Sequence, residues 1–455
     1  LVVLGAGLGG DGEALGHGQA DIGHLRQIGT LAARKIRYNK NLMYHQMIRS
    51  EVPVGGSNGR WTSCSDLAGV SKFFPRATAF EILPKRDIIR NMELKRLKSS
   101  LEQIEDPRRT NGGHILHKLE DIIIIGLCTV VCGGEDFPDM EEFGKEREEW
   151  LKKFLELPHG IPDSDTFRRV FERIKPEALS ECLYDWLGCH RQEGSVIAVD
   201  GKTIRGSKTD SHKAYHVVSA FAAENQLVLG EIVTDEKSNE ITAVPELLGS
   251  LNIENSIITA DAMSCQKEIV KKIREGKADY VISLKGNHPA LLEDISLYFE
   301  HFSGELPSFV TKVKDHGRLE KRDYRLLNDL SWLPQQAEWD GLQAVGMVTA
   351  TISRGNETTT DARYFLSSVT DLERFAYAVR KHWSIENQLH WCLDAIFNED
   401  ASKACKDMSP LNLNILRKTA LALCKNADFG RRLSIQKKRF AAALNPQRLL
   451  DILFG

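Results

Sequence analysis

Two short apolar segments that each end in an aspartate constrain the fold of this 455-residue chain more than any other feature. The segment VIAVD places four apolar residues directly before Asp200, and SIITAD places a similar run before Asp261. Such runs predict buried strands, and an ionised carboxylate at the end of one is costly unless a positive charge lies nearby. Strands that end in aspartate can bring two carboxylates to one divalent cation. We therefore expect an α/β core with a metal site at one edge of its sheet.

A third carboxylate, Glu386, lies in a segment without Gly or Pro whose apolar residues recur at helical spacing. His382, Glu386 and His390 are four residues apart and share one face of that helix. Three hard oxygen donors suit Mg²⁺ or Mn²⁺, and two such ions about 3.5–4 Å apart can activate a water or hydroxyl for phosphodiester chemistry. The sequence thus predicts a metal site built from the two aspartates and Glu386.

Five motifs carry this Asp-Asp-Glu order along the chain: AVDGKTIRGS, ITADAMSCQ, YVISLKGNH, DHGRLEKRDYR and HWSIENQLHWCLD. In that order they resemble the DDE transposases of bacterial insertion sequences, in the H-repeat-associated (ISAs-type) branch. The resemblance covers residues 92–455 and implies a ribonuclease H-like core with Asp200, Asp261 and Glu386 as metal-binding catalytic residues. It implies that DNA is cut at the element's ends and that the freed 3′-hydroxyl attacks target DNA, with a pair of Mg²⁺ (or Mn²⁺) ions.

Composition and periodicity divide the chain into four parts. Residues 1–91 are rich in Gly, begin without Met and are interpreted as a disordered or non-native upstream extension. Residues 92–190 predict an all-helical N-terminal domain, for binding DNA ends or equally for packing or dimerisation. Residues 191–400 alternate strands and helices as an α/β core does, with a β-rich insertion at about 287–365. Residues 401–455 carry 11 Lys or Arg against 3 Asp and predict a basic helical segment.

Polar residues that follow the predicted strands, or that surround Glu386, are the expected DNA contacts. Cations after strands would meet phosphate, alternating cations on one strand face would follow the DNA backbone, and an indole on the helix would stack on an unpaired base. The predicted DNA-binding residues are Lys202, Arg205, Lys285, Asn287, His316, Arg318, Arg322, His382, Trp383, Asn387 and His390. The same cations also suit an ordinary charged surface, and Trp383 suits core packing.

Three further hypotheses remain beside the transposase. A metal-dependent nuclease would use the same core without strand transfer, and a DNA-binding relic would no longer catalyse. The segment GAGLGG matches GxGxxG at Gly5, Gly7 and Gly10, but the second strand and the acidic residue of a dinucleotide-binding unit do not follow it. Nucleotide binding is therefore the weakest of these hypotheses.

Composition, the longest apolar run and the cysteine spacing support the remaining predictions, on solubility, membrane insertion and disulfides. A net charge of −3 with 27% charged and 42% hydrophobic residues is typical of a soluble globular protein. The longest apolar run, DIIIIGLCTVVC, is shorter than the roughly 20 residues that span a bilayer, so it predicts a buried helix. Nine scattered Cys without a CxxC pair argue against a disulfide framework. We expect a cytoplasmic, nucleoid-associated protein that binds double-stranded DNA as transposon ends and target, without a membrane, and dimerises to pair two ends.

Overall fold

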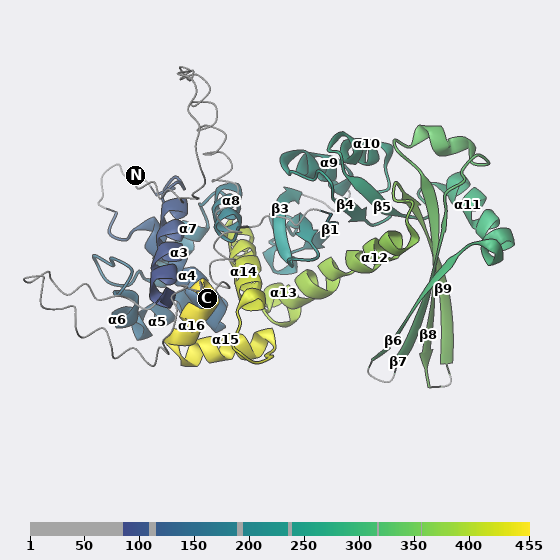
Figure 1. Cartoon of the computed structure of the whole chain (residues 1–455). Coiled ribbons are helices and arrows are strands. Elements are labelled where there is room, and N and C mark those ends of the chain that lie inside the picture. The colour runs from purple at the N-terminus through teal and green to yellow at the C-terminus, as the bar shows by residue number, and fades with distance from the viewer. Residues whose placement is uncertain (1–84, 109–114, 189–193, 235–238, 316–317, 356) are drawn as a thin grey trace, which may run out of the picture. The chain divides into compact units, whose positions relative to one another are not determined.

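The computed structural model describes residues 85–108, 115–188, 194–234, 239–315, 318–355 and 357–455, which Figure 1 draws as ribbons. Contacts divide the chain into two compact units, Leu1–Glu81 and Ile82–Gly455. The first unit, including the GAGLGG motif and most of the predicted upstream extension, lies outside the described residues. The helix that the sequence predicts from Met92 begins earlier, at Lys85.

Helices from the two ends of the second unit share one hydrophobic core. The N-terminal and C-terminal helices are α3 Lys85–Leu101, α4 Leu119–Cys132, α5 Phe137–Glu146, α6 Glu148–Leu151, α7 Ser164–Phe171, α8 Pro176–Trp186, α14 Ser409–Asn426, α15 Ile435–Leu444 and α16 Pro446–Phe454. The apolar helix α4 is buried almost throughout, as its sequence predicts, and it contacts α5, α14 and α15. The segments 92–190 and 401–455, separate in sequence, therefore form one helical body.

Nine strands pair in one mixed sheet. They are β1 Val196–Thr203, β2 His216–Ala222, β3 Leu227–Thr234, β4 Ile257–Ala260, β5 Asp279–Leu284, β6 Ser308–Asp315, β7 Arg318–Leu327, β8 Ala344–Arg354 and β9 Glu357–Ser367. Their order is β3-β2-β1-β4-β5-β9-β8-β7-β6, in which β1, β4 and β5 are parallel and the other pairings are antiparallel. The five core strands are confirmed where the sequence predicts them. The insertion is not a separate sheet, because β9 pairs with β5.

Helices cover both faces of the sheet (Figure 1). One face carries α9 Glu240–Ser250, α10 Lys267–Glu275 and α11 Pro289–Phe302; the other carries α12 Leu372–His382 and α13 Trp391–Ala395. Short turns at Arg205–Ser207, Ser303–Glu305, Pro334–Glu338 and Glu399–Ala401 join these elements. In the parallel strands, Ile197 packs toward α9 and α10, whereas Val196 and Ile257 pack toward α12. Because side chains alternate along a strand, residues at even numbers on β1 and odd numbers on β4 point to the α12 side.

Many cations of the basic C-terminal segment point inward. Lys418 pairs with Glu231 of β3, and Lys438 donates to the backbone carbonyls of Cys424 and Ala427. Arg439 is also buried. These cations stabilise the helical body instead of forming a continuous basic surface. Across the described ranges, every helix is too short or too polar to cross a membrane.

Candidate active site

Asp200 and Asp261 lie at the ends of adjacent parallel strands. The last registered pair between β1 and β4 joins Val199 to Ala260, so the next residue along each strand is one of the two aspartates. Neighbouring strands are about 4.8 Å apart, and the alternation along each strand directs both carboxylates to the α12 side. The two predicted aspartates therefore face the helix that carries Glu386.

His390 approaches Asp200 from that helix. Its Nδ1 lies 3.4 Å from Oδ2 of Asp200, whose side chain is 30% exposed. Burial acts to raise the pKa of Asp200, but the hydrogen bond from His390 and the charges of His390 and His382 outweigh it, so the pKa lies below its ordinary value. Asp200 is therefore ionised at neutral pH and suited to a cation.

The loop after β4 holds Asp261 in place. Oδ1 of Asp261 accepts hydrogen bonds from the backbone N–H groups of Met263 at 3.0 Å and Ser264 at 3.2 Å. Nδ2 of Asn287 donates to the carbonyl oxygen of Ala262 at 2.8 Å. Asn287, predicted as a DNA contact, thus ties the segment after β5 to the loop that orients Asp261.

Glu386 begins a π-helical turn. The turn spans Glu386–His390 between α12 and α13, and the N–H of Trp391 donates to the carbonyl of Glu386. Such turns are rare in helices and occur frequently at functional sites. The turn widens the helix and so changes the directions in which side chains on either side of it point. Glu386 is exposed, whereas His390 faces Asp200.

His382 lies among all three predicted carboxylates. Its Nδ1 is 3.2 Å from the hydroxyl of Thr259, a buried residue of β4. Burial lowers the pKa of His382, and the negative charges of Asp200, Asp261 and Glu386 oppose that effect without overcoming it. Its charge therefore acts on Asp200 in acid, where that carboxyl titrates, and the lowered pKa favours the neutral imidazole at pH 7.

The described residues contain no three Asp, Glu, His or Cys side chains that converge closely enough to hold a metal ion. The two aspartates supply oxygen donors from adjacent strands, and this chemistry fits Mg²⁺ or Mn²⁺. Glu386 stands apart from that pair in this conformation. The residues therefore fit a cation at the aspartates, with the third predicted ligand nearby on the facing helix.

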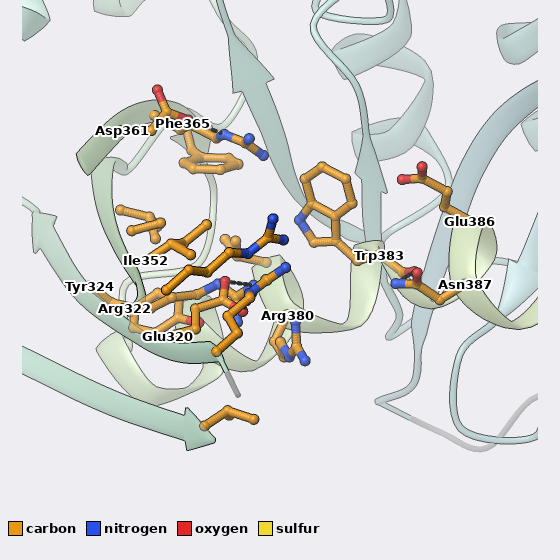
Figure 2. A pocket seen from close by; sticks show the side chains of 17 residues that line it. Glu320, Arg322, Tyr324, Ile352, Asp361, Phe365, Arg380, Trp383, Glu386 and Asn387 are labelled. Carbon is orange, nitrogen blue, oxygen red and sulfur yellow. Dashed lines mark hydrogen bonds and ion pairs between the residues drawn. The ribbon is translucent and has the colours of Figure 1, made fainter. Parts of the chain in front are cut away.

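An open groove of about 650 Å³ lies beside Glu386, between strands β6–β9 and α12, and Figure 2 shows its side chains. We call it the arginine groove. Its polar lining consists of Arg318, Arg322, Arg354, Arg363, Arg380, Glu320, Asp361, Trp383, Glu386 and Asn387. The arginines outnumber the carboxylates, so the groove suits an anionic ligand.

The arginines of the groove crowd one another. Burial lowers the pKa of Arg322, and the charge of Arg380 lowers it further. Glu320 offsets part of this repulsion by pairing with Arg322 and, at 2.6 Å, with Arg318. An additional anion would relieve the remaining repulsion. A phosphate group is an anion of suitable charge and geometry for arginine.

Trp383 stands on the Glu386 side of the groove (Figure 2). The guanidinium carbon of Arg363 lies 5.0 Å from the centroid of its ring, which is a cation–π contact. Nδ2 of Asn387 donates to the backbone carbonyl of Trp383 at 2.9 Å. The indole is therefore in contact with a strand arginine, while Asn387 holds the backbone of its helix.

Four of the predicted DNA-binding residues line the arginine groove: Arg318, Arg322, Trp383 and Asn387. Sequence reasoning missed Arg354, Arg363 and Arg380. Arg380 shares a helix face with Trp383 and Asn387 at i, i+3 and i+7, and that spacing could have revealed it. Arg354 of β8 and Arg363 of β9 show no comparable spacing in the sequence. They come beside α12 only through the pairing of the two strands in the sheet.

The other predicted DNA contacts lie in different surroundings. Arg205 and Lys285 are exposed, and Asn287 binds backbone carbonyls. Lys202 is surrounded by carboxylates, with its side chain only 11% exposed. His316 lies outside the described residues. Whether any of them contacts DNA remains a prediction.

Similarity to known proteins agrees with the mixed α/β fold. Residues 98–187 match the family described as DDE_Tnp_1-associated, and residues 191–423 match the Transposase DDE domain. The chain belongs to the DDE transposase family, whose substrate is DNA and whose members generally use divalent metal ions. The resemblance that the five motifs predict is confirmed.

Its relatives include proteins of Escherichia coli. The chain is 38% identical over 379 residues to "Putative transposase YncI" of strain O157:H7, covering 80% of this chain and 95% of that protein. It is 38% identical over 382 residues to "H repeat-associated putative transposase YhhI" of strain K12, covering 80% and 99%. A short K12 relative named "Inactive transposase YbfQ" is 36% identical over 84 residues, covering 18% and 98%.

Proposed function

We propose that this chain is an active transposase that cuts DNA at insertion-sequence ends and joins the freed 3′-hydroxyl to target DNA. The observation that carries the proposal is the placement of Asp200 and Asp261 on adjacent strand ends, opposite the helix that holds Glu386 and His390. The strand order β3-β2-β1-β4-β5, with β2 and β3 antiparallel, supports a ribonuclease H-like core. Residues 191–400 provide this core, and the insertion extends its sheet.

A pair of Mg²⁺ or Mn²⁺ ions, held by Asp200, Asp261 and Glu386, would activate a water or 3′-hydroxyl and stabilise the leaving oxygen of the phosphodiester. The chain's own residues prepare this site. His390 contacts Asp200 from the facing helix, and Asn287 steadies the loop of Asp261. Because a phosphodiester exchange needs positioning and charge stabilisation more than covalent help, no nucleophilic side chain is required.

The arginine groove supports a path for DNA toward the site. It ends at Glu386, and its arginines and Trp383 offer phosphate contacts together with a surface for base stacking. Exposed Arg205 and Lys285 would extend the contacts around the aspartates. Two ends must be brought together for transposition, so we include a homodimer in the proposal.

The test is cleavage of labelled DNA that carries the element's own ends, in Mg²⁺ or Mn²⁺. Wild type should nick at the ends, and EDTA should stop it. Asp200→Asn, Asp261→Asn and Glu386→Gln should each abolish nicking while DNA binding persists. Glu373→Gln is the matched control, because Glu373 is an exposed glutamate in the first turn of α12. Full activity in any one of the three site variants would contradict the assignment.

A joining assay separates the transposase from the alternatives. Pre-cut ends should be transferred to a target plasmid by the transposase, whereas a nuclease would cut without joining. A relic would bind the ends and neither cut nor join them. The relative named as inactive is short and matches only 18% of this chain, so the joining assay and not that name decides between these alternatives.

A further inference from the structure

We propose that Lys202 is a positioning residue, which fixes the helix carrying Glu386 and His390 against the strand carrying Asp200. The inference rests on the proposed DNA-cutting function and names the contact that holds the two halves of that site in register. It gives Lys202 a different role from the DNA contact that the sequence suggests.

The ammonium group of Lys202 is enclosed by three carboxylates. Its Nζ lies 2.7 Å from Oδ1 of Asp394, 2.9 Å from Oε2 of Glu399 and 3.5 Å from Oδ1 of Asp400. Its side chain is only 11% exposed, and its three partners leave the ammonium poorly placed to meet a phosphate.

Lys202 and Asp200 each pair with one residue of the facing helix. They are two residues apart on β1, so they point to the same side of the sheet. His390 and Asp394 are four residues apart and share one face of the helix. Asp200 meets His390 at 3.4 Å, and Lys202 meets Asp394 at 2.7 Å.

The two pairs favour the observed register. A slip of one helical turn in one direction would place Asp394 opposite Asp200, and a slip in the other direction would place Glu386 opposite Asp200. Either slip sets two carboxylates against each other, which is destabilising where the groups are partly buried and no cation lies between them. Either slip also separates Lys202 from Asp394. Lys202 therefore specifies where Glu386 lies along β1.

A buried connection extends from Lys202 to the helical body. Glu399 is 0% exposed, accepts a hydrogen bond from Nδ2 of Asn414 at 2.7 Å and lies 3.9 Å from Arg417 of α14. Burial would raise the pKa of Glu399, but Lys202 and Arg417 hold it below its ordinary value. The strand, the segment after the π turn and α14 thus meet at one ion-pair cluster.

α14 also holds the π turn directly. Nζ of Lys425 donates to the carbonyl oxygen of Gln388 inside the turn at 2.6 Å. The turn is therefore fixed from α14 through Lys425 and from β1 through Lys202 and Asp394. On β1, the pair of Lys202 with Asp394 adds to the contact of His390 with Asp200.

The experiment compares Lys202→Met with Lys202→Arg and with Arg417→Met in the full chain. Arg417→Met is the matched control, because it removes a buried cation from Glu399 without touching β1. Three quantities are measured: hydrogen exchange of the peptide covering 386–395, the thermal midpoint, and kcat and KM for DNA cleavage in Mg²⁺.

Lys202→Met should speed exchange in 386–395 and lower kcat about tenfold to a hundredfold, as a misplaced catalytic group does, with KM for DNA nearly unchanged. Lys202→Arg should recover part of both effects. Arg417→Met should lower the thermal midpoint comparably while leaving exchange in 386–395 and kcat close to wild type.

Two results would overturn the proposal. Equal effects of Lys202→Met and Arg417→Met on exchange and kcat would mean that the cluster only stabilises the fold. A raised KM with unchanged kcat and exchange would mean that Lys202 contacts DNA. If wild type cuts no DNA, the proposed function fails, but the exchange measurement still decides the positioning role by itself.

Discussion

Gly201→Ala should destabilise the strand that carries Asp200. Gly201 follows that aspartate on β1 and packs over a buried pair formed by His216 of β2 and Glu240 of α9, which are 2% and 3% exposed. Nε2 of His216 lies 2.5 Å from Oε1 of Glu240, and Nδ1 lies 2.9 Å from the hydroxyl of Thr203. A Cβ at Gly201 would lie 2.8 Å from Cδ of Glu240 and closer still to the two paired atoms.

The size of the effect follows from this geometry. A separation below 3.0 Å is essentially never seen for a Cβ, so the buried pair must move. Overpacking of this kind costs about 1–3 kcal/mol, and parting the pair would leave a buried charge that costs about 3–5 kcal/mol. We expect Gly201→Ala to lower the free energy of unfolding by about 3 kcal/mol, between these two limits.

Urea unfolding followed by circular dichroism measures this loss. Gly286→Ala is the matched control, because a Cβ there meets nothing within 4 Å, and it should stay within about 0.5 kcal/mol of wild type. In a Glu240→Ala background the added Cβ has more room, so Gly201→Ala should cost clearly less there. Equal unfolding midpoints for Gly201→Ala and Gly286→Ala would refute the steric argument.

Three further predictions concern charge. Burial lowers the pKa of Lys425 in the folded chain to about 8. Because the unfolded chain binds this proton more tightly, the free energy of unfolding should rise by up to about 3 kcal/mol between about pH 8 and 10.5. Urea titrations of Lys425→Met should lack that rise. The lowered pKa of Asp200 stabilises the fold at any pH above about 3.9, the pKa of this group in the unfolded chain. This contribution is lost as the pH falls through the pKa of the folded state. Asp200→Asn should therefore lose less stability in acid than wild type does. Fluorescence anisotropy titrations measure how DNA affinity falls with salt concentration. Arg380→Ala should reduce the slope of log K against log salt concentration by about one phosphate contact. Arg374→Ala should leave that slope unchanged, because Arg374 is an exposed residue of the same helix outside the groove.

The sequence predicts the core strands and the positions of the aspartates because both depend on local patterns. An apolar run that ends in a carboxylate identifies β1 and β4 without knowledge of the rest of the fold. The helical spacing before Glu386 likewise identifies α12. The π turn leaves no comparable signal, since the residues from Glu386 to His390 have ordinary helical character. Its effect on where Glu386 points is visible only in three dimensions.

Long-range partners explain most of what the sequence did not reveal. Lys202 follows Asp200 in a motif that suggests an exposed phosphate contact, yet its partners Asp394 and Glu399 lie almost two hundred residues further on. A lysine stem can either reach solvent or carry its charge to a buried acid, and spacing does not distinguish the two. The cations of the C-terminal segment are ambiguous for the same reason, as buried Lys418 and Lys438 illustrate.

The pairing of β9 with β5 also has a consequence for solubility. Without this partner, the strand Asp279–Leu284 would end the sheet with a short, almost wholly buried apolar edge, and such edges promote pairing between molecules. The insertion moves the end of the sheet to β6, where the exposed Lys312 and Lys314 alternate with less polar residues. Lysines on an edge strand discourage the approach of another strand. The hairpins beside the arginine groove thus also protect the core sheet from self-association.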